Sequence, residues 1–443
     1  MTRPPLLSGA AAPDPATPTA AAGGPAAGRG PAAGGGPPAA RPGTGLGPRD
    51  PRPGLSGLGL EELAAWVAAR AHPAYRARQV LDFVWSGLAV APEDLRTLPR
   101  GLRAELDGAF RVDTIAATDV RVSDGGRTEK SLHRLSDGAL IESVLMHYPA
   151  RAGSRERHTL CISSQAGCAV GCPFCATGEL GFTRDLETAE ILDQVRDAGR
   201  RLRVDGRRLT NVVFMGMGEP LLNLDRVLEA VTALSDPARL GLGARHITVS
   251  TSGVVPGIRR LTSLGPQFTL AVSLHSARDA LRDVLVPLNR RWPVAEVVAA
   301  ARDHARATGR RVSYEYTMIG GVNDTDADAA ALADLLRGEL AHVNLIPMNP
   351  VAHTPWTASS MPVVERFAGR LRAAAVPVTV RRNRGQEIGA ACGQLAAERA
   401  GEPPAPVVAR RRERIVAESA AALRGERSGG AGPIPGGPAG TEE

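Results

Sequence analysis

Hydrophobic and polar positions follow two different periods in the first third of the chain. Residues 58–71, 74–88 and 98–110 have apolar side chains at helical spacing, which predicts three short amphipathic helices. Residues 118–148 alternate with a period near two, and Asp-Gly pairs at 124–125 and 137–138 lie where hairpin turns belong. The pattern predicts a small α+β accessory module at 56–150, ahead of a larger domain.

From residue 159 on, short apolar runs alternate with helical patterns. Apolar strands separated by helices indicate parallel βα units. About six such units favour an α/β domain at 151–397, built as an incomplete (βα)6 TIM-type barrel. An open doubly wound sheet is the alternative. The runs are 159–164, 211–217, 246–252, 268–275, 311–319 and 342–349, and a last run at 376–382 follows another helix.

Polar motifs follow these runs at the ends where barrel enzymes have their chemistry. A cysteine-rich segment follows the first run. The second, third, fourth and sixth runs are followed by "GMGEP", "STSG", "SLHS" and "IPMNP". We therefore expect these segments to meet at one face of the domain.

Both ends of the chain differ in composition from this folded part. Residues 1–55 are mainly Ala, Gly, Pro and Arg, and residues 398–443 repeat that bias. Such segments bury too little apolar surface to offset chain entropy, so we expect a disordered tail at 1–55 and a mostly disordered one at 398–443. No apolar run approaches the roughly 20 residues of a membrane helix, which predicts a soluble, cytoplasmic protein without a membrane partner.

The chain is basic, with a net charge of +7 and a pI of about 9.7. A basic chain suits a polyanionic partner such as nucleic acid. Lys130 is the only lysine, however, and an arginine excess of this kind is also typical of a GC-rich coding bias. Aromatic residues make up only 3% of the chain, so no base-stacking platform is visible. Charge alone leaves both interpretations open.

Four of the five cysteines lie within fifteen residues, and Cys168, Cys172 and Cys175 are spaced C-x3-C-x2-C. An odd, clustered set indicates a metal or redox site and not a secreted disulfide framework. A structural zinc site normally needs four ligands, and Cys161, inside a predicted strand, is an awkward fourth. Three thiolates on a [4Fe–4S] cluster leave one iron open to a small molecule. A zinc knuckle or an electron-transfer cluster remains the alternative.

The segment "CAVGCPFC" resembles the radical S-adenosylmethionine (SAM) signature, in which the open iron chelates the amino and carboxylate groups of SAM. A longer set covers most of residues 57–396: "CISSQAGCAVGCPFCATG", "FMGMGEPLLN", "STSGVVP", "SLH", "LIPMNP" and "AACGQL". Together these motifs resemble the ribosomal and transfer RNA adenine carbon-2 methyltransferases, the RlmN family. The resemblance implies methylation of a specific adenosine in 23S ribosomal RNA and of the adenosine next to the anticodon in transfer RNAs.

The resemblance also implies roles for individual residues. Cys392 is expected to be the methyl carrier, as an S-methylcysteine, and Cys161 the resolving thiol that forms a transient disulfide with it. Glu142 matches the family's proton acceptor, although Cys161 is an open alternative for that step. One [4Fe–4S] cluster and two SAM molecules per turnover are expected, with Cys168, Cys172 and Cys175 as the iron ligands.

The SAM contacts follow from the same matches. Gly218 and Glu219 match the loop that meets the methionine ammonium. The remaining contacts are Ser250, Ser273, Leu274, His275 and Asn349. "RRNRG" at 381–385 is a candidate phosphate contact or a solvated basic stretch, and the resemblance makes the module at 56–150 an RNA-binding domain.

Further partners would be ribosomal and transfer RNA, a flavodoxin- or ferredoxin-type electron donor and a thiol reductant. Two rival functions remain. The sister enzymes that methylate carbon 8 of the ribosomal adenosine share every cysteine. The composition of the whole chain and the sequences of its motifs are, however, more typical of a housekeeping enzyme that methylates carbon 2. A non-catalytic iron–sulfur or zinc RNA-binding protein would need neither Cys392 nor Cys161.

Overall fold

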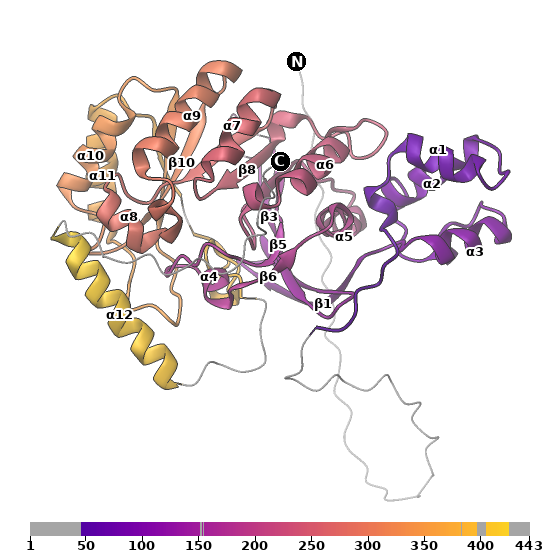
Figure 1. Cartoon of the computed structure of the whole chain (residues 1–443), viewed down its shortest axis with the longest axis horizontal. Coiled ribbons are helices and arrows are strands. Elements are labelled where there is room, and N and C mark those ends of the chain that lie inside the picture. The colour runs from indigo at the N-terminus through magenta and orange to yellow at the C-terminus, as the bar shows by residue number, and fades with distance from the viewer. Residues whose placement is uncertain (1–45, 151–152, 154, 382, 397–404, 425–443) are drawn as a thin grey trace, which may run out of the picture. The chain divides into compact units, whose positions relative to one another are not determined.

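A ten-stranded sheet organises the chain (Figure 1). The computed structural model describes residues 46–150, 153, 155–381, 383–396 and 405–424. The strands are β1 (Ile115–Ser123), β2 (Thr128–Leu135), β3 (Leu140–Tyr148), β4 (Arg157–Cys161), β7 (Asn211–Phe214), β8 (Ile247–Thr251), β9 (Thr269–Ser273), β10 (Val312–Met318), β11 (Ala341–Pro347) and β12 (Val378–Val380), and they neighbour one another in this order.

The strands from β4 to β12 in this sheet are parallel and follow chain order. A doubly wound sheet would reverse its order at a switch point, and this sheet does not. The predicted α/β partial barrel is therefore confirmed. Six βα units precede the last strand, β12.

Helices between the parallel strands pack against the sheet through apolar faces, as the periodic patterns predict (Figure 1). In α5, for example, Ile191, Leu192 and Val195 are buried, while the arginines near the end of the helix, around Arg203, are exposed or half-buried. The helices are α4 (Ala176–Leu180), α5 (Thr188–Val204), α6 (Leu224–Ser235), α7 (Val255–Leu264), α8 (Asp279–Leu285), α9 (Val294–Thr308), α10 (Asp326–Leu336) and α11 (Met361–Ala373).

The three helices expected in the first third of the chain are confirmed as α1 (Leu60–Ala68), α2 (Tyr75–Trp85) and α3 (Arg100–Ala109). Both Asp-Gly turns are confirmed as well, because β1–β2 and β2–β3 pair antiparallel around them. Strand β3 then pairs antiparallel with β4, with Val144 opposite Cys161. The boundary predicted near residue 150 thus falls between two neighbouring strands of one sheet, and the division into domains stays a prediction.

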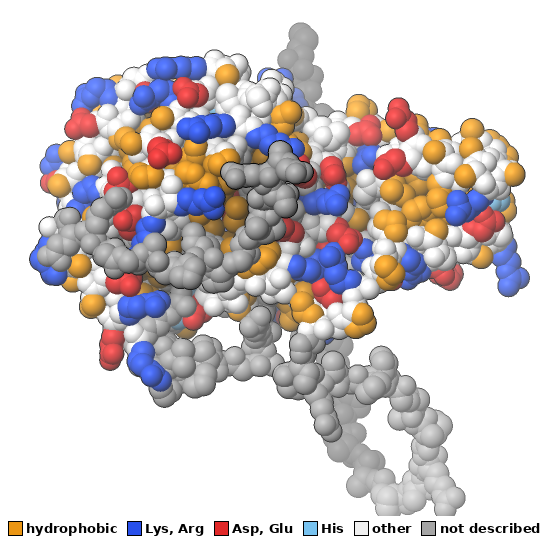
Figure 2. Space-filling model, viewed as in Figure 1, with side chains coloured by type: hydrophobic (Ala, Val, Ile, Leu, Met, Phe, Trp, Pro, Cys, Tyr) orange, Lys and Arg blue, Asp and Glu red, His pale blue; other side chains and the backbone are white. Residues whose placement is uncertain are grey.

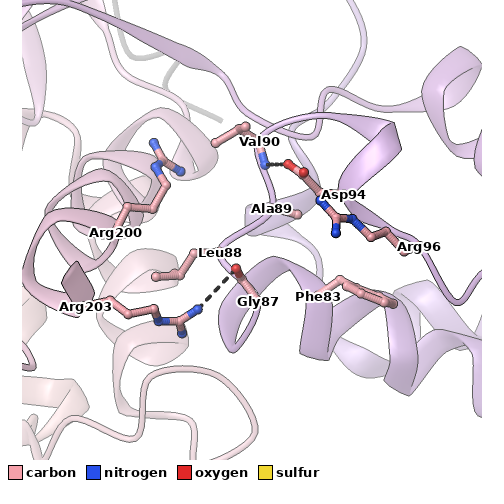
Figure 3. A pocket seen from close by; sticks show the side chains of 9 residues that line it. All are labelled: Phe83, Gly87, Leu88, Ala89, Val90, Asp94, Arg96, Arg200 and Arg203. Carbon is pink, nitrogen blue, oxygen red and sulfur yellow. Dashed lines mark hydrogen bonds between the residues drawn. The ribbon is translucent and has the colours of Figure 1, made fainter. Parts of the chain in front are cut away.

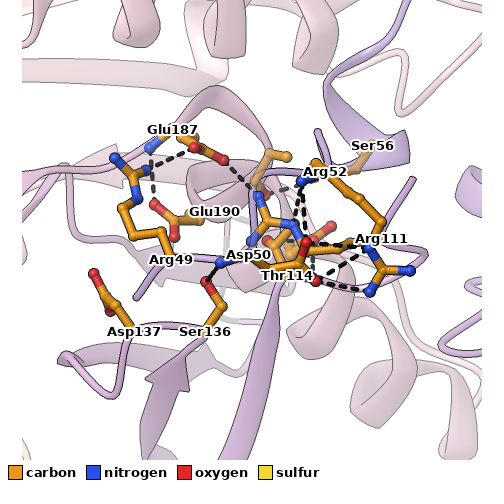
Figure 4. A network of polar contacts seen from close by, with 12 residues as sticks. Arg49, Asp50, Arg52, Ser56, Arg111, Thr114, Ser136, Asp137, Glu187 and Glu190 are labelled. Carbon is orange, nitrogen blue, oxygen red and sulfur yellow. Dashed lines mark hydrogen bonds and ion pairs between the residues drawn. The ribbon is translucent and has the colours of Figure 1, made fainter. Parts of the chain in front are cut away.

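The N-terminal segment corrects the prediction of a disordered tail that extends to residue 55. Residues 1–45 lie outside the described residues, but those from 46 on are held by charged contacts (Figure 4). Arg49 and Arg111 both bind the carboxylate of Glu187, each at 2.6 Å. Leu55 is fully buried beside this network.

A helix also lies in the stretch predicted to be mostly disordered. Helix α12 (Ala405–Leu423) packs against α8, and its Ile415 and Ala422 are buried. Residues 397–404 and 425–443, which make up the rest of that stretch, lie outside the described residues. Among the helices of the described part, none is long and apolar enough to cross a membrane.

Candidate active site

The cysteine loop follows β4 and is enclosed by a small two-stranded sheet, β5 (Gln165–Gly167) and β6 (Phe182–Asp185). Cys168 donates its backbone N–H to the carbonyl of Gly181 at 2.9 Å. Gly167 has a φ of +78°, and a Cβ there would lie 1.9 Å from the Gly181 oxygen, so this crossing requires glycine. The crossing fixes both ends of the loop that contains Cys168, Cys172 and Cys175.

The three thiols fit an iron–sulfur cluster better than a single metal ion. Burial raises the pKa of Cys172 well above its usual range, and the neighbouring Cys175 and Cys168 raise it further. Yet no three His, Cys, Asp or Glu side chains of the described residues converge on one ion position. In a cluster each thiolate binds a different iron, so convergence is not needed. Bound iron would take the place of the thiol protons.

A buried cation lies beside this loop. Arg282 is fully buried, and its guanidinium donates to the carbonyls of Leu274 (2.9 Å), Ser252 (2.7 Å) and Ser273 (3.2 Å). Burial lowers the pKa of Arg282 to about 10. The nearby Cys172 has the largest of the opposing effects, which raise this pKa. Arg282 thus ties the ends of β8 and β9 together next to the cysteine loop.

The "GMGEP" loop after β7 crosses directly over the chain that leaves β4. A Cβ at Gly216 would lie 2.7 Å from the carbonyl of Ile162, and one at Gly218 would lie 2.8 Å from the backbone nitrogen of Gln165. Gly218 also has a φ of +104°, which side chains rarely allow. The two glycines therefore allow the loop to lie against the start of the cysteine segment.

Glu219 links the ends of two strands. Its carboxylate is 1% exposed and accepts the backbone N–H groups of Leu221 (3.0 Å) and Ser252 (2.6 Å), one on each oxygen. Burial raises the pKa of this carboxyl group, and the two N–H donors oppose the rise. The expected contact with the SAM ammonium stays a prediction, and a carboxylate oxygen with one donor can accept another.

His275 joins the end of β9 to the cysteine loop. Its ring meets that of Phe174 edge-on, with centroids 4.8 Å apart, and its Nδ1 accepts the N–H of Thr317 at 3.0 Å. Burial lowers the pKa of His275 to about 3, so the ring is neutral with its proton on Nε2. Ser250, on β8, donates its hydroxyl to the carbonyl of Phe214 at 2.6 Å.

Asn349 supports the loop that contains Cys392. Its amide donates to the carbonyl of Cys392 at 2.9 Å and accepts from Gln386 at 2.7 Å. On the other side, Ala176, next to Cys175, donates its N–H to the carbonyl of Gly393 at 2.7 Å. The structure thus brings the Cys392 loop directly onto the cysteine loop.

The two distant cysteines meet in the same place. Burial raises the pKa of Cys161 to about 12, and the nearby Cys392 raises it further. Desolvation by the surrounding protein raises the pKa of Cys392 to about 11, and the nearby Cys175 raises it further. The Cys392 residue is nevertheless exposed. Arg381 lowers the pKa of both thiols. The Cys392 loop therefore lies near both Cys175 and Cys161, and we call these three residues the thiol cluster.

Known proteins resemble this chain closely. Residues 162–333 match the family model of the radical SAM superfamily. A curated protein of Parafrankia sp. (strain EAN1pec), "Probable dual-specificity RNA methyltransferase RlmN", is 52% identical over 78% of this chain and 91% of its own. The protein of that name from Saccharopolyspora erythraea is 50% identical over 81% of this chain and 97% of its own. This chain belongs to the RlmN family.

A solved structure agrees with this assignment. The crystal structure of a radical SAM methyltransferase from Sphaerobacter thermophilus is 48% identical, covers 78% of this chain and all of its own, and superposes with a TM-score of 0.75. This RlmN family member is therefore a SAM-dependent methyltransferase that acts on RNA. Membership of the radical SAM superfamily implies a [4Fe–4S] cluster and SAM, and the three loop cysteines are the thiols available for it.

Glu142 of this RlmN family member is buried and not solvated. It lies on β3 with 1% of its side chain exposed, its Oε1 is 2.9 Å from the ammonium of Lys130, and its Oε2 accepts the N–H of Ala396 at 3.0 Å. The structure thus places the expected proton acceptor under the Cys392 loop. Sequence reasoning missed Lys130, and the only signal for it was that it is the chain's single lysine.

The arginines of the basic segment 381–385 make different contacts. Arg384 donates to the carbonyl of His147 at 2.9 Å and lies over the ring of Tyr148 at 4.4 Å. Arg381 is 3.6 Å from the carboxylate of Glu315, and position 382 lies outside the described residues. Arg384 is therefore held against β3, while Arg381 lies near the thiol cluster.

Proposed function

We propose that this protein methylates carbon 2 of a specific adenosine in 23S ribosomal RNA and of the adenosine next to the anticodon in transfer RNAs, through an S-methylcysteine at Cys392. The main support is the position of the Cys392 loop, because Ala176, next to Cys175, donates its N–H to Gly393 at 2.7 Å and Asn349 donates to the carbonyl of Cys392 at 2.9 Å. A carrier that first takes a methyl group and later meets a second thiol needs this neighbourhood. The dual-specificity names of the relatives support two kinds of RNA substrate.

The target carbon explains why such chemistry is needed. Carbon 2 of adenine lies between two ring nitrogens and is too electron-poor to attack the methyl group of SAM. A [4Fe–4S] cluster with SAM supplies, when bound, the radical chemistry that bypasses this limit. Cys168, Cys172 and Cys175 would hold the one cluster. Gly218, Glu219, Ser250, Ser273, Leu274, His275 and Asn349 would surround SAM, two molecules of which are used per turnover.

Cys392 first takes a methyl group from one SAM by nucleophilic displacement, which requires its thiolate. The neighbouring Arg381 favours that thiolate, because it lowers the pKa of Cys392. The radical chemistry that the cluster and SAM supply would remove one hydrogen from the S-methyl group, and that carbon would then bond to carbon 2, so that the RNA is joined to Cys392.

Release of the RNA requires loss of the carbon-2 proton and attack of the Cys161 sulfur on the sulfur of Cys392, which breaks the bond between the Cys392 sulfur and the transferred carbon. That carbon takes up the proton that Cys161 gives up and becomes the methyl group of the RNA product. The product is a Cys161–Cys392 disulfide, which a thiol reductant of the cytoplasm would reduce. A thiol with a pKa of about 12 holds its own proton at neutral pH, so Cys161 is a poor acceptor for another. The buried carboxylate of Glu142 is the better proton acceptor. An electron donor of the flavodoxin or ferredoxin type would supply the reducing electron.

The helical module is the proposed RNA-binding part. A hollow of about 460 Å³ opens where the end of α2 meets α5, and its lining includes Phe83, Arg96, Arg200 and Arg203 (Figure 3). Arg200 is paired with Asp113 and Asp197, whereas Arg96 is exposed. On the face in Figure 2, basic and acidic side chains are intermixed. Guanidinium groups suit phosphate oxygens, so this hollow is a candidate for contact with the RNA backbone.

The experiment that tests the function compares three proteins on a short RNA that contains the target adenosine. Wild-type protein should produce 2-methyladenosine, identified by mass spectrometry of the digested RNA. Cys161→Ala should still acquire a methyl group on Cys392, but should accumulate a covalent protein–RNA adduct on a denaturing gel. Cys161→Ala/Cys392→Ala should form no adduct.

Two results would contradict the proposal. Finding 8-methyladenosine would assign the sister activity. Normal turnover by Cys161→Ala would exclude the two-cysteine route. Metal analysis of anaerobically purified protein adds a control, since zinc without iron would favour a non-catalytic RNA-binding protein.

A further inference from the structure

Composition and burial together single out Lys130. It is the only lysine among 53 lysine and arginine residues, so at every other basic position the chain has arginine. This lysine is also buried, with 6% of its side chain exposed. Arginine cannot replace lysine freely where the cation must be compact, because the guanidinium is a larger planar group.

The surroundings of the Lys130 ammonium favour a compact cation. Its Nζ is 2.9 Å from Oε1 of Glu142. On another side lies Gly389, where an added Cβ would be 3.4 Å from Nζ and the φ is +63°. The pair thus lies beneath the loop that contains Cys392, three residues beyond Gly389.

We propose that Lys130 is a positioning residue that holds Glu142 ionised and aimed at the reacting adenine, so that Glu142 accepts the proton from carbon 2. The inference rests on the function proposed above. In this step the C2–H bond breaks, its electron pair stays with the purine, and the proton passes to a carboxylate oxygen of Glu142. The carboxylate becomes a neutral acid, and Lys130 remains an ammonium.

The physical reason is the burial of Glu142. A carboxylate with 1% exposure and no neighbouring cation is strongly disfavoured and takes up a proton instead of remaining charged. A protonated Glu142 could not accept another proton. The backbone N–H of Ala396 donates to Oε2, which fixes the direction of the carboxylate but adds no full charge. Lys130 supplies that charge.

Two arginines on the elements around this pair have carboxylate partners of their own. The elements packed against β2 and β3 contribute Asp119 and Arg121 on β1, Asp124 in the β1–β2 turn, Cys161 on β4, and Arg381 and Glu387 in the loop after β12. Arg121 is paired with Asp119 at 2.9 Å, and Arg381 lies near Glu315. Within the described part of the chain, Glu142 forms its ion pair with Lys130.

The test measures release of RNA from Cys392 in a single turnover at several pH values. Lys130→Met should still acquire the methyl group on Cys392 and form the covalent adduct. At about pH 6.5 its release step should be at least tenfold slower than in wild-type protein, and the rate should rise by up to about tenfold per pH unit as Glu142 loses its proton. The wild-type rate should change little over that range.

Two further variants separate charge from structure. Lys130→Met/Glu142→Gln lacks both charges and should release RNA slowly at every pH. Lys130→Arg keeps the charge, so its pH profile should be flat even if poor fit lowers the rate. If Lys130→Met does not fold, as judged by circular dichroism, the shape of the Lys130→Arg profile decides, because a profile that rises with pH would refute the proposal.

Several outcomes would overturn the inference. Wild-type release by Lys130→Met at every pH would remove the role of the ammonium. Slow release that does not depend on pH would indicate a structural role alone, as would loss of methyl loading on Cys392. If wild-type protein itself formed neither S-methylcysteine nor adduct, the proposed function would fail, and this result is distinct from the others.

Discussion

Replacing Arg282 with methionine tests how the ends of β8 and β9 are held together. Arg282 is fully buried, and its four hydrogen bonds reach the carbonyls of Ser252, Ser273 and Leu274 and the side chain of Asn289. Methionine fills similar space but donates nothing. The three carbonyls, two of which belong to the expected SAM contacts Ser273 and Leu274, would then lack this donor.

The expected cost follows from these contacts. An orphaned buried carbonyl costs about 1–3 kcal/mol, but the charge of Arg282 is itself costly to bury, as its lowered pKa of about 10 indicates. Three orphaned carbonyls outweigh the relief from burying one charge less, so we expect a net loss of about 3–5 kcal/mol in the free energy of unfolding. Against a total of about 5–15 kcal/mol, the variant should fold but unfold early.

Urea unfolding of the apoprotein, followed by circular dichroism, measures this loss. Arg306→Met on α9 is the matched control, because Arg306 is exposed and its loss should change stability by less than about 0.5 kcal/mol. Arg282→Lys should fall between wild type and Arg282→Met, since an ammonium retains the charge but cannot reach all four acceptors. A loss below about 1 kcal/mol for Arg282→Met would refute the argument that this residue ties β8 to β9.

Three further predictions concern binding and pH. Gly218→Ala should weaken SAM binding to reconstituted protein in calorimetry by the equivalent of about 1–3 kcal/mol, whereas Gly206→Ala, also at positive φ but in open space, should not. Arg96→Ala should weaken RNA binding in a filter assay and lower its salt slope by about 1, while Arg306→Ala should leave both unchanged. Burial lowers the pKa of His133 from 6.5 to about 4, so stability should fall as pH drops below 6.5, by up to about 1.4 kcal/mol per unit, and His133→Gln should flatten that dependence in urea unfolding.

The sequence predicted those elements whose signal is periodic. The helices at 58–71 and 74–88 and the hairpins around the two Asp-Gly turns have strong local patterns, and tertiary packing did not override them. Strands β5 and β6 are three and four residues long, too short for a period to show. The contact of Arg49 with Glu187 joins residues 138 positions apart, so composition alone marked the segment from 46 as part of a tail.

The site was predictable as a set of residues but not as an arrangement. Strand order indicated that the motifs after β4, β7, β8 and β9 would meet, because parallel strands end at one edge. Pattern gave no reason for Glu142 to be buried, since a strand glutamate is usually solvated. Its partner Lys130 has no motif of its own. The Ala- and Arg-rich composition around helix α12 led to the prediction of a mostly disordered tail there. The i,i+4 spacing of Arg414 and Glu418 nevertheless suits a helix.

The antiparallel strands are part of the active site because of the loop that follows β12. Cys161 ends β4, near the middle of the ten-stranded sheet, while β12 is at its far edge. The loop returns from that edge to the antiparallel strands: Gly385 donates its N–H to Asp124 at 3.0 Å, and Ala396 donates to Glu142 at 3.0 Å. Cys392 lies between these two anchors. Barrel residues 151–397 alone would lack both acceptors, so the loop that contains Cys392 would lose these two contacts and keep only those with the barrel.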